Sequence, residues 1–138
     1  MAILFHNQHI DFKLKYGPKI KSWVKRIIEL EKRKIGNINF VFTTDEDLLK
    51  VNQQFLKHDT YTDIITFDYT EGKTINSDIM ISVDRVGENA KKLSIEFQEE
   101  MRRVMIHGIL HLCGYKDKTK ADSELMRKKE NWALKKFV

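Results

Sequence analysis

Two of the five histidines lie four residues apart in the stretch Met105-Ile106-His107-Gly108-Ile109-Leu110-His111-Leu112-Cys113-Gly114-Tyr115-Lys116-Asp117. On an α-helix such a pair shares one face, one turn apart, so both imidazoles can reach one ion. Gly114 fits the left-handed position that ends a helix and turns the chain. That turn would bring Asp117 back toward the two rings. The stretch predicts a central helix with three N/O ligands, an arrangement typical of catalytic zinc.

A histidine pair in an apolar helix also has a purely structural interpretation. A histidine on an apolar face is usually a core residue whose ring nitrogens have ordinary hydrogen-bond partners. Here Ile109 and Leu112 imply that both rings are buried, and a shared metal would give each ring a partner. We therefore favour a metal site, with His107, His111 and Asp117 as ligands of one zinc ion per chain.

The same residues carry a family resemblance. The run from His107 to Tyr115 resembles the H-G-x-L-H-L-x-G-Y signature of the YbeY family, metal-dependent endoribonucleases that mature bacterial ribosomal RNA. In that family the signature continues Asp-His, and the final histidine is the third zinc ligand. Lys116 and Asp117 stand at these two positions, so the resemblance implies a carboxylate as third ligand here, which zinc accepts.

Length and composition describe an ordinary globular chain. Its 138 residues are 41% hydrophobic and 33% charged, which predicts one domain spanning 1–138. No apolar run approaches the roughly 20 residues of a membrane span, and residues 1–13 lack the pattern of a signal peptide. A single cysteine, Cys113, fits a reducing cytoplasm. We expect it to pack as a small hydrophobe.

The first third of the chain predicts a strand, a helix and a second strand. Residues 2–6 fit a short strand, and Gly17-Pro18 opens a helix at a position that tolerates proline. We expect Gly36 to end this helix. The following apolar positions alternate as in a half-buried strand: Ile38, Phe40 and Phe42.

The middle of the chain predicts a helix and a hairpin. Thr44 and Asp47 have the spacing of a capping box, so a helix should begin near Asp45. Its packed face would consist of Leu48, Val51, Asn52 and Phe55. Two β-rich runs, 62–67 and 77–82, flank a Glu71-Gly72 turn and fit adjacent strands.

These segments extend the resemblance over more than half of the chain, from about Asn52 to Leu134. Residues 62–67 resemble the family's T-D-V-L-S-F run, and 77–82 its G-D-I-x-I-S strand. Leu56 is a departure, because the family usually carries at this position an arginine that is implicated in activity.

Asp63 and Asp78 each lie in an otherwise apolar strand, where an unpaired carboxylate is costly. One interpretation is structural, with each carboxylate accepting hydrogen bonds from backbone N–H groups or pairing with a lysine. The alternative is that they orient a metal-bound histidine or the attacking water. The catalytic residues beyond a metal-activated water are otherwise open.

The last third predicts three helices. The first begins at Asp84, with Val86, Ala90 and Leu93 apolar, and Ser94 should cap the central helix. Leu125, Trp132 and Leu134 should anchor the final helix. His6, His9 and His58 have no motif around them and fit surface or turn positions.

Positive charge gathers on the predicted first and last helices. The chain has a net charge of +5 and a pI near 9.2, and its basic residues include Lys32, Arg33 and Lys34 on the first helix. Such runs are usually solvated surface, but the repetition on two helices makes them candidates for binding RNA phosphates. The candidates are Lys25, Arg26, Lys128 and Lys129.

We therefore expect an α+β fold: one mixed sheet of about four strands packed by helices, with the metal-binding helix at its centre. Gly108 occupies the position of the glutamate in the H-E-x-x-H motif, so the peptidase general base is absent. The resemblance implies single-strand-specific cleavage of ribosomal RNA, including 16S 3′-end processing, and ribosome quality control, with RNA and ribosomal particles as partners. Two alternatives are a metal-dependent hydrolase of another substrate, including peptides, and a non-catalytic assembly factor with a structural metal.

Overall fold

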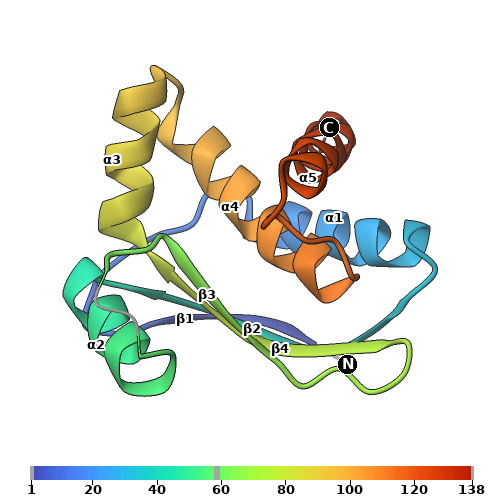
Figure 1. Ribbon diagram of the computed structural model, residues 1–138, viewed down its shortest axis with the longest axis horizontal. Coiled ribbons are helices and arrows are strands. Elements are labelled where there is room, and N and C mark those ends of the chain that lie inside the picture. Colours follow the sequence, from blue (N-terminus) through green and yellow to red (C-terminus); the bar gives the residue numbers. More distant parts are fainter. Residues whose placement is uncertain (1, 58–59, 138) are drawn as a thin grey trace.

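A four-stranded mixed sheet forms the base of the fold in the computed structural model, which describes residues 2–57 and 60–137 (Figure 1). The strand order is β1-β2-β4-β3, with bounds β1 Ile3–Asn7, β2 Lys34–Thr43, β3 Ile64–Asp68 and β4 Thr74–Ser82. β1, β2 and β4 are parallel, and β3 pairs antiparallel with β4 across the Glu71-Gly72 turn. The α+β expectation is confirmed. His58 lies outside the described residues.

Four helices stand on one side of the sheet (Figure 1). They are α1 Gly17–Leu30, α3 Val83–Leu93, α4 Phe97–Leu112 and α5 Lys120–Lys135. α4 packs on β3 and β4 and lies between α3 and α5, so it is the central helix of this layer. Trp23 Nε1 donates to the Ala133 carbonyl at 2.8 Å and ties α1 to α5.

Alternation along the strands creates two different faces. In β2 and β4, fully buried side chains such as Phe40 and Ile79 face α1 and α4. Their neighbours Val41 and Met80 face the opposite side, where α2 (Asp45–Phe55) lies. We call these the covered face and the open face of the sheet. α2 begins as predicted, because the Thr44 hydroxyl accepts from the Asp47 N–H at 3.1 Å.

The first helix ends earlier than the sequence indicated. α1 stops at Leu30, and Lys32 takes the left-handed conformation (φ 63°) expected of a glycine. Lys32 and Arg33 therefore follow the helix, and Lys34 begins β2. Gly36 instead lies at a register shift within β2. A Cβ there would come within 2.6 Å of the Ile75 carbonyl oxygen, so close approach of two backbones requires this glycine.

Helix capping and three apolar positions also differ from expectation. Ser94 ends α3 in a left-handed conformation, and Glu96 is the N-cap of α4. Phe55, Leu93 and Leu125 are exposed. On α5 the buried positions are Met126, Glu130 and Ala133, one helical face that includes an acidic residue, while Trp132 and Leu134 are half-buried against the core as expected. Among the described helices none is long and apolar enough to cross a membrane.

Candidate metal centre

The C-terminal half of α4 carries both histidines, and a tight turn ends it. Gly114 has φ 108°, and its N–H donates to the His111 carbonyl at 3.0 Å. The Tyr115 N–H donates to the Leu110 carbonyl at 3.1 Å, which completes a Schellman motif. The predicted glycine turn is confirmed, and it directs the chain back toward the helix.

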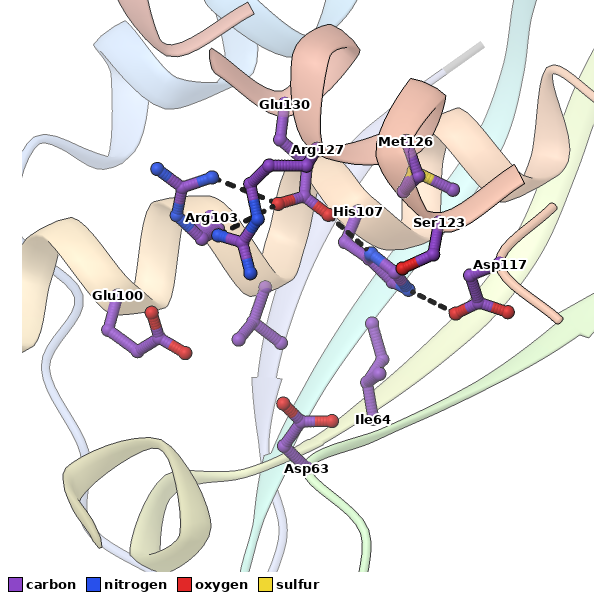
Figure 2. Close-up of a pocket in the computed structure, with 11 residues that line it drawn as sticks. Asp63, Ile64, Glu100, Arg103, His107, Asp117, Ser123, Met126, Arg127 and Glu130 are labelled. Carbon is purple, nitrogen blue, oxygen red and sulfur yellow. Dashed lines mark hydrogen bonds and ion pairs between the residues drawn. The ribbon is translucent and has the colours of Figure 1, made fainter. Parts of the chain in front are cut away.

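The turn brings Asp117 to both rings. Asp117 Oδ2 lies 3.2 Å from His107 Nε2, a contact drawn in Figure 2, and 3.2 Å from His111 Nε2. The two ring centroids are 4.6 Å apart, with the rings inclined at 82°. Each of the three residues offers one ligand atom, and these three atoms all lie within 4.8 Å of one another. The structure thus brings together the three residues that the sequence selected.

These three groups fit a cation. Tetrahedral ligands at zinc–nitrogen and zinc–oxygen distances lie roughly 3.3 Å apart, close to the two 3.2 Å separations seen here. Two imidazole nitrogens and a carboxylate oxygen directed at one point are stable only with positive charge between them, either a proton or a metal ion. The donor set of two nitrogens and one oxygen is one that zinc accepts.

Glu130 holds His107 from the other side of the ring. Its Oε2 lies 2.6 Å from His107 Nδ1, and its Oε1 accepts from Arg103 Nη1 at 2.9 Å. Burial alone would raise the pKa of Glu130, but the hydrogen bonds from His107 and Arg103 lower it. An ionised Glu130 accepts only, so Nδ1 must donate and Nε2 faces the ligand group. Glu130 therefore fixes the tautomer and orientation of His107, as carboxylates do for histidines that bind metals.

His107 responds to the surrounding carboxylates. Burial alone would lower its pKa, but the hydrogen bond and charge of Glu130, with the charges of Asp117 and Asp63, raise it. The raised pKa of His107 again indicates that the surrounding carboxylates favour positive charge at the site.

Sequence reasoning missed Glu130, although a signal was present. Met126, Glu130 and Ala133 follow helical spacing, and all three are buried on one face of α5. An acidic residue in the middle of an apolar stripe requires a partner. The sequence analysis took Leu125 as an anchor and gave Glu130 no role, whereas Leu125 is exposed and its neighbour Met126 is buried.

A cleft of about 330 Å³ opens beside His107, between α4, α5 and the start of β3 (Figure 2). Four carboxylates line it, from Asp63, Glu100, Asp117 and Glu130, and its two cationic side chains are Arg103 and Arg127. Burial raises the pKa of Asp63 despite the opposing charge of His107, and burial also raises the pKa of Glu100. Asp63 thus faces the cleft, as the interpretation that it orients a histidine or the attacking water requires.

Asp78 lies elsewhere. It is on the open face of β4, where its Oδ1 accepts from Asn39 Nδ2 at 3.0 Å. Its neighbour Ile79 faces α4, close to Gly108. A carboxylate on the opposite side of the sheet cannot orient the histidines, so only the structural interpretation of Asp78 agrees with its position.

The basic candidates divide into free and engaged side chains. Lys25, Arg26 and Lys128 are exposed on α1 and α5. Lys129 Nζ lies 2.7 Å from Glu31 Oε2 and 3.6 Å from the centroid of the Trp132 ring. Lys129 is therefore committed to contacts within the protein.

Cys113 and Leu56 both lie outside the cleft. Cys113 packs against the core, and burial raises the pKa of its thiol to about 11. This agrees with its expected role as a small hydrophobe. Leu56 is 45% exposed and lines a separate hollow with Tyr61 and Thr62.

Known proteins resemble this chain both in sequence and in structure. The chain is 50% identical over 131 residues to the "Endoribonuclease YbeY" of Flavobacterium psychrophilum, covering 95% of this chain and 94% of the relative. It is 53% identical over 120 residues to the protein of that name from Christiangramia forsetii, covering 87% and 84%. A Thermotoga maritima protein of known solution structure matches with a TM-score of 0.67 at 26% identity, over 99% of this chain and 89% of that one. The family model described as "Endoribonuclease YbeY" matches residues 4–138, and the chain therefore belongs to this family.

Proposed function

We propose that this protein is a metal-dependent, single-strand-specific endoribonuclease. Its substrate would be ribosomal RNA, including the 16S 3′ end, and it would act in ribosome maturation and quality control in the cytoplasm. The observation that supports this most strongly is the convergence of His107, His111 and Asp117 beside a cleft whose lining includes His107, Asp117 and Arg127. The family supports the choice of RNA as the substrate.

His107, His111 and Asp117 would hold one zinc ion. When bound, zinc lowers the pKa of water toward neutrality and polarises a phosphoryl oxygen, which are the two requirements of phosphodiester hydrolysis. Glu130 keeps His107 Nε2 directed at the ligand group, and Arg103 keeps Glu130 in place.

Asp63 is the cleft carboxylate best suited to move a proton. It faces the cavity near His107, and its charge is among those that raise the pKa of that ring (Figure 2). Burial raises the pKa of Asp63 itself, which brings it nearer to the range in which a general base works. We propose that Asp63 accepts a proton from the attacking water.

The exposed cations would hold RNA outside the cleft. Lys25, Arg26 and Lys128 are free to contact phosphates, while Lys129 supports α5 through Glu31. Phosphate contacts position the nucleic acid without reading its sequence.

Elemental analysis combined with an RNA-cleavage assay tests the proposal. Wild-type protein should contain about one zinc ion per chain and cleave single-stranded RNA. His111→Ala should lose metal and slow cleavage more than about 100-fold, because changes in residues that merely orient ligands already cost up to that much. Asp78→Asn serves as the matched control on the open face and should retain both properties.

Other outcomes would identify a different function. Stoichiometric metal in His107→Ala would rule out the assigned ligands. A folded His111→Ala protein that binds ribosomal particles as well as wild type, with no cleavage by either protein, would instead support an assembly factor.

A further inference from the structure

One wall of the cleft has no part in the chemistry described above. It consists of Glu100 on α4 and Arg127 on α5, whose side chains face the same cavity (Figure 2). The charge of Arg127 acts on Glu100, which places the two groups within electrostatic reach. Neither residue belongs to the metal-ligand group.

One oxygen of the Glu100 carboxyl group is buried without a partner. The residue is 5% exposed, and its Oε1 has no hydrogen-bond partner among the described residues. Arg103, one turn along α4, does not pair with it, because its guanidinium is held by Glu130 and Asn131 at 2.9 and 3.0 Å. Buried carboxyl groups normally have partners, so an unpaired one in a cleft suggests a ligand with a hydrogen-bond donor.

Arg127 is held less tightly than Arg103. Its side chain is 60% exposed, and its Nη1 forms only a long ion pair with Glu130 Oε1, at 3.6 Å. That distance exceeds a hydrogen bond, and both oxygens of Glu130 already have closer partners in Arg103 and His107. The guanidinium therefore retains its donors for an anion, such as phosphate, that matches its fork geometry.

The charge of the cleft favours this cation as the phosphate contact. Arg103 is held by Glu130, and His107 lies between Glu130 and Asp117, so Asp63 and Glu100 remain to repel a phosphodiester. Apart from a metal ion bound at His107, the lining cation best placed to offset them is Arg127.

We propose that Glu100 and Arg127 form a subsite for one ribose–phosphate unit of the RNA backbone. Glu100 accepts a hydrogen bond from the ribose 2′-hydroxyl, and Arg127 binds the adjacent phosphate. The subsite rests on the proposed endoribonuclease function and adds to it a means of distinguishing RNA from DNA. The 2′-hydroxyl is the group by which proteins make this distinction.

Two ligand groups share the required chemistry, a donor next to a phosphate. One is the 2′-hydroxyl, which is found only in RNA, and the other is the exocyclic amine of a base, which is found in both nucleic acids. At about 330 Å³ the cleft is at the small end of ligand pockets, which favours a single backbone unit.

Binding by metal-free protein tests the subsite without any cleavage. We would measure the affinity of wild type, Glu100→Leu and Arg127→Met for a single-stranded RNA and for DNA of the same sequence. Wild type should prefer RNA. Glu100→Leu should lower the ratio of RNA affinity to DNA affinity roughly tenfold, because the hydrogen bond to the sugar is lost for RNA alone, whereas the loss of the carboxylate's charge acts on both nucleic acids alike.

Arg127→Met should weaken RNA and DNA binding alike and reduce the salt slope by about 0.7, the value for one phosphate on a single strand. Lys50→Met, which removes one exposed charge from α2, is the matched control and should change neither. Equal slopes in the two variants would overturn the role of Arg127.

A scan of single 2′-deoxy substitutions along the RNA requires no protein variant, in case Glu100→Leu fails to fold. One position should weaken binding to wild type roughly tenfold. The absence of any sensitive position would overturn the subsite. So would an unchanged preference for RNA in folded Glu100→Leu, because it would mean that Glu100 binds only water. An equal loss of RNA and DNA affinity in Glu100→Leu would point to a base amine and overturn recognition of the sugar.

The subsite and the proposed function fail separately. Wild type that cleaves RNA but binds RNA and DNA equally would disprove the subsite alone. Wild type that prefers RNA through Glu100 but does not cleave it with metal would disprove the endoribonuclease and leave the subsite standing.

Discussion

The two faces of the sheet are built from alternate residues of the same strands, yet they differ in burial and in the elements that lie against them. On the covered face, Phe40, Ile79 and Ile81 are fully buried beneath the helix layer that holds the metal-ligand group. On the open face, Asn39, Asp78 and Met80 border a shallow hollow with the exposed Phe55 of α2. Neighbouring residues of one strand thus lie on opposite faces: one packs beneath the helices that carry His107 and His111, and the next faces the hollow beside α2.

The comparison shows why residue type alone did not locate the carboxylates. Asp63 and Asp78 both precede an isoleucine in an apolar strand, and the sequence treats them alike. Asp63 lies in the cleft, whereas Asp78 pairs with Asn39 on the other face. Ile64 and Ile79 both face Gly108 of α4, but Asp63 precedes β3, so the alternation that places Asp78 on the open face does not fix the side chain of Asp63.

The largest expected difference between the faces concerns stability. Ile79→Ala should lower the free energy of unfolding by about 2–5 kcal/mol, because it leaves a cavity beneath α4. Met80→Ala, its neighbour on the open face, should cost about 1 kcal/mol or less. Urea denaturation of both variants measures the difference, and equal losses would show that the open face is as tightly packed as the covered one.

The next difference concerns the two carboxylates and metal binding. Glu130→Gln should weaken zinc affinity roughly 10- to 100-fold, because His107 loses an ionised acceptor that fixes its orientation. Asp78→Asn should leave zinc affinity unchanged. Competition titration with a chelator measures both, and a metal defect in Asp78→Asn would contradict the separation of the faces.

In metal-free protein, the contribution of the His107–Glu130 ion pair to stability should depend on pH. The pKa of Glu130 is lowered from 4.5, so its stabilisation is complete above that value and is lost as pH falls through the folded pKa. The pKa of His107 is raised from 6.5, so its stabilisation is present below that value and is lost as pH rises through the folded pKa. The stability difference between wild type and Glu130→Gln should therefore be greatest between about pH 4.5 and 6.5. Thermal unfolding across this range tests it, and a constant difference would refute the coupling.

The smallest expected effect concerns surface charge. Reversing Lys25 and Arg26 together should weaken RNA binding several-fold and flatten its dependence on salt, because both are free cations on the helix layer. Lys50→Glu, on α2 beside the open face, is the matched control. If all three reversals act alike per charge, RNA binding is not confined to the helix layer.

Local features of this protein were predictable where the sequence states them directly. The histidine spacing, the glycine turn after α4 and the Thr44 cap each depend on neighbouring residues, and the structure confirms all three. The alternation of Phe40 and Phe42 likewise predicted a buried strand face.

The features that were missed depend on exceptions to local rules or on distant contacts. Lys32 ends α1 in a conformation that usually requires glycine, so the end of the helix was misplaced. Glu130 was overlooked because its meaning comes from His107 and Arg103 on another helix. Gly36 was read as a helix stop, although Ile75 of the neighbouring strand explains it.

Gly108 has a consequence for the evolutionary routes open to this protein. A Cβ at this position would lie 2.8 Å from Ile64 Cδ1 and 3.5 Å from Ile79 Cγ2, so the helix rests almost directly on the sheet. A glutamate there would clash with both side chains and bury a charge between them. Ile64 Cδ1 is the end of a flexible side chain and could move aside for a Cβ, but the buried carboxylate would still cost stability. The contact that seats the histidines therefore makes the shortest mutational path from this scaffold to an H-E-x-x-H peptidase a costly one.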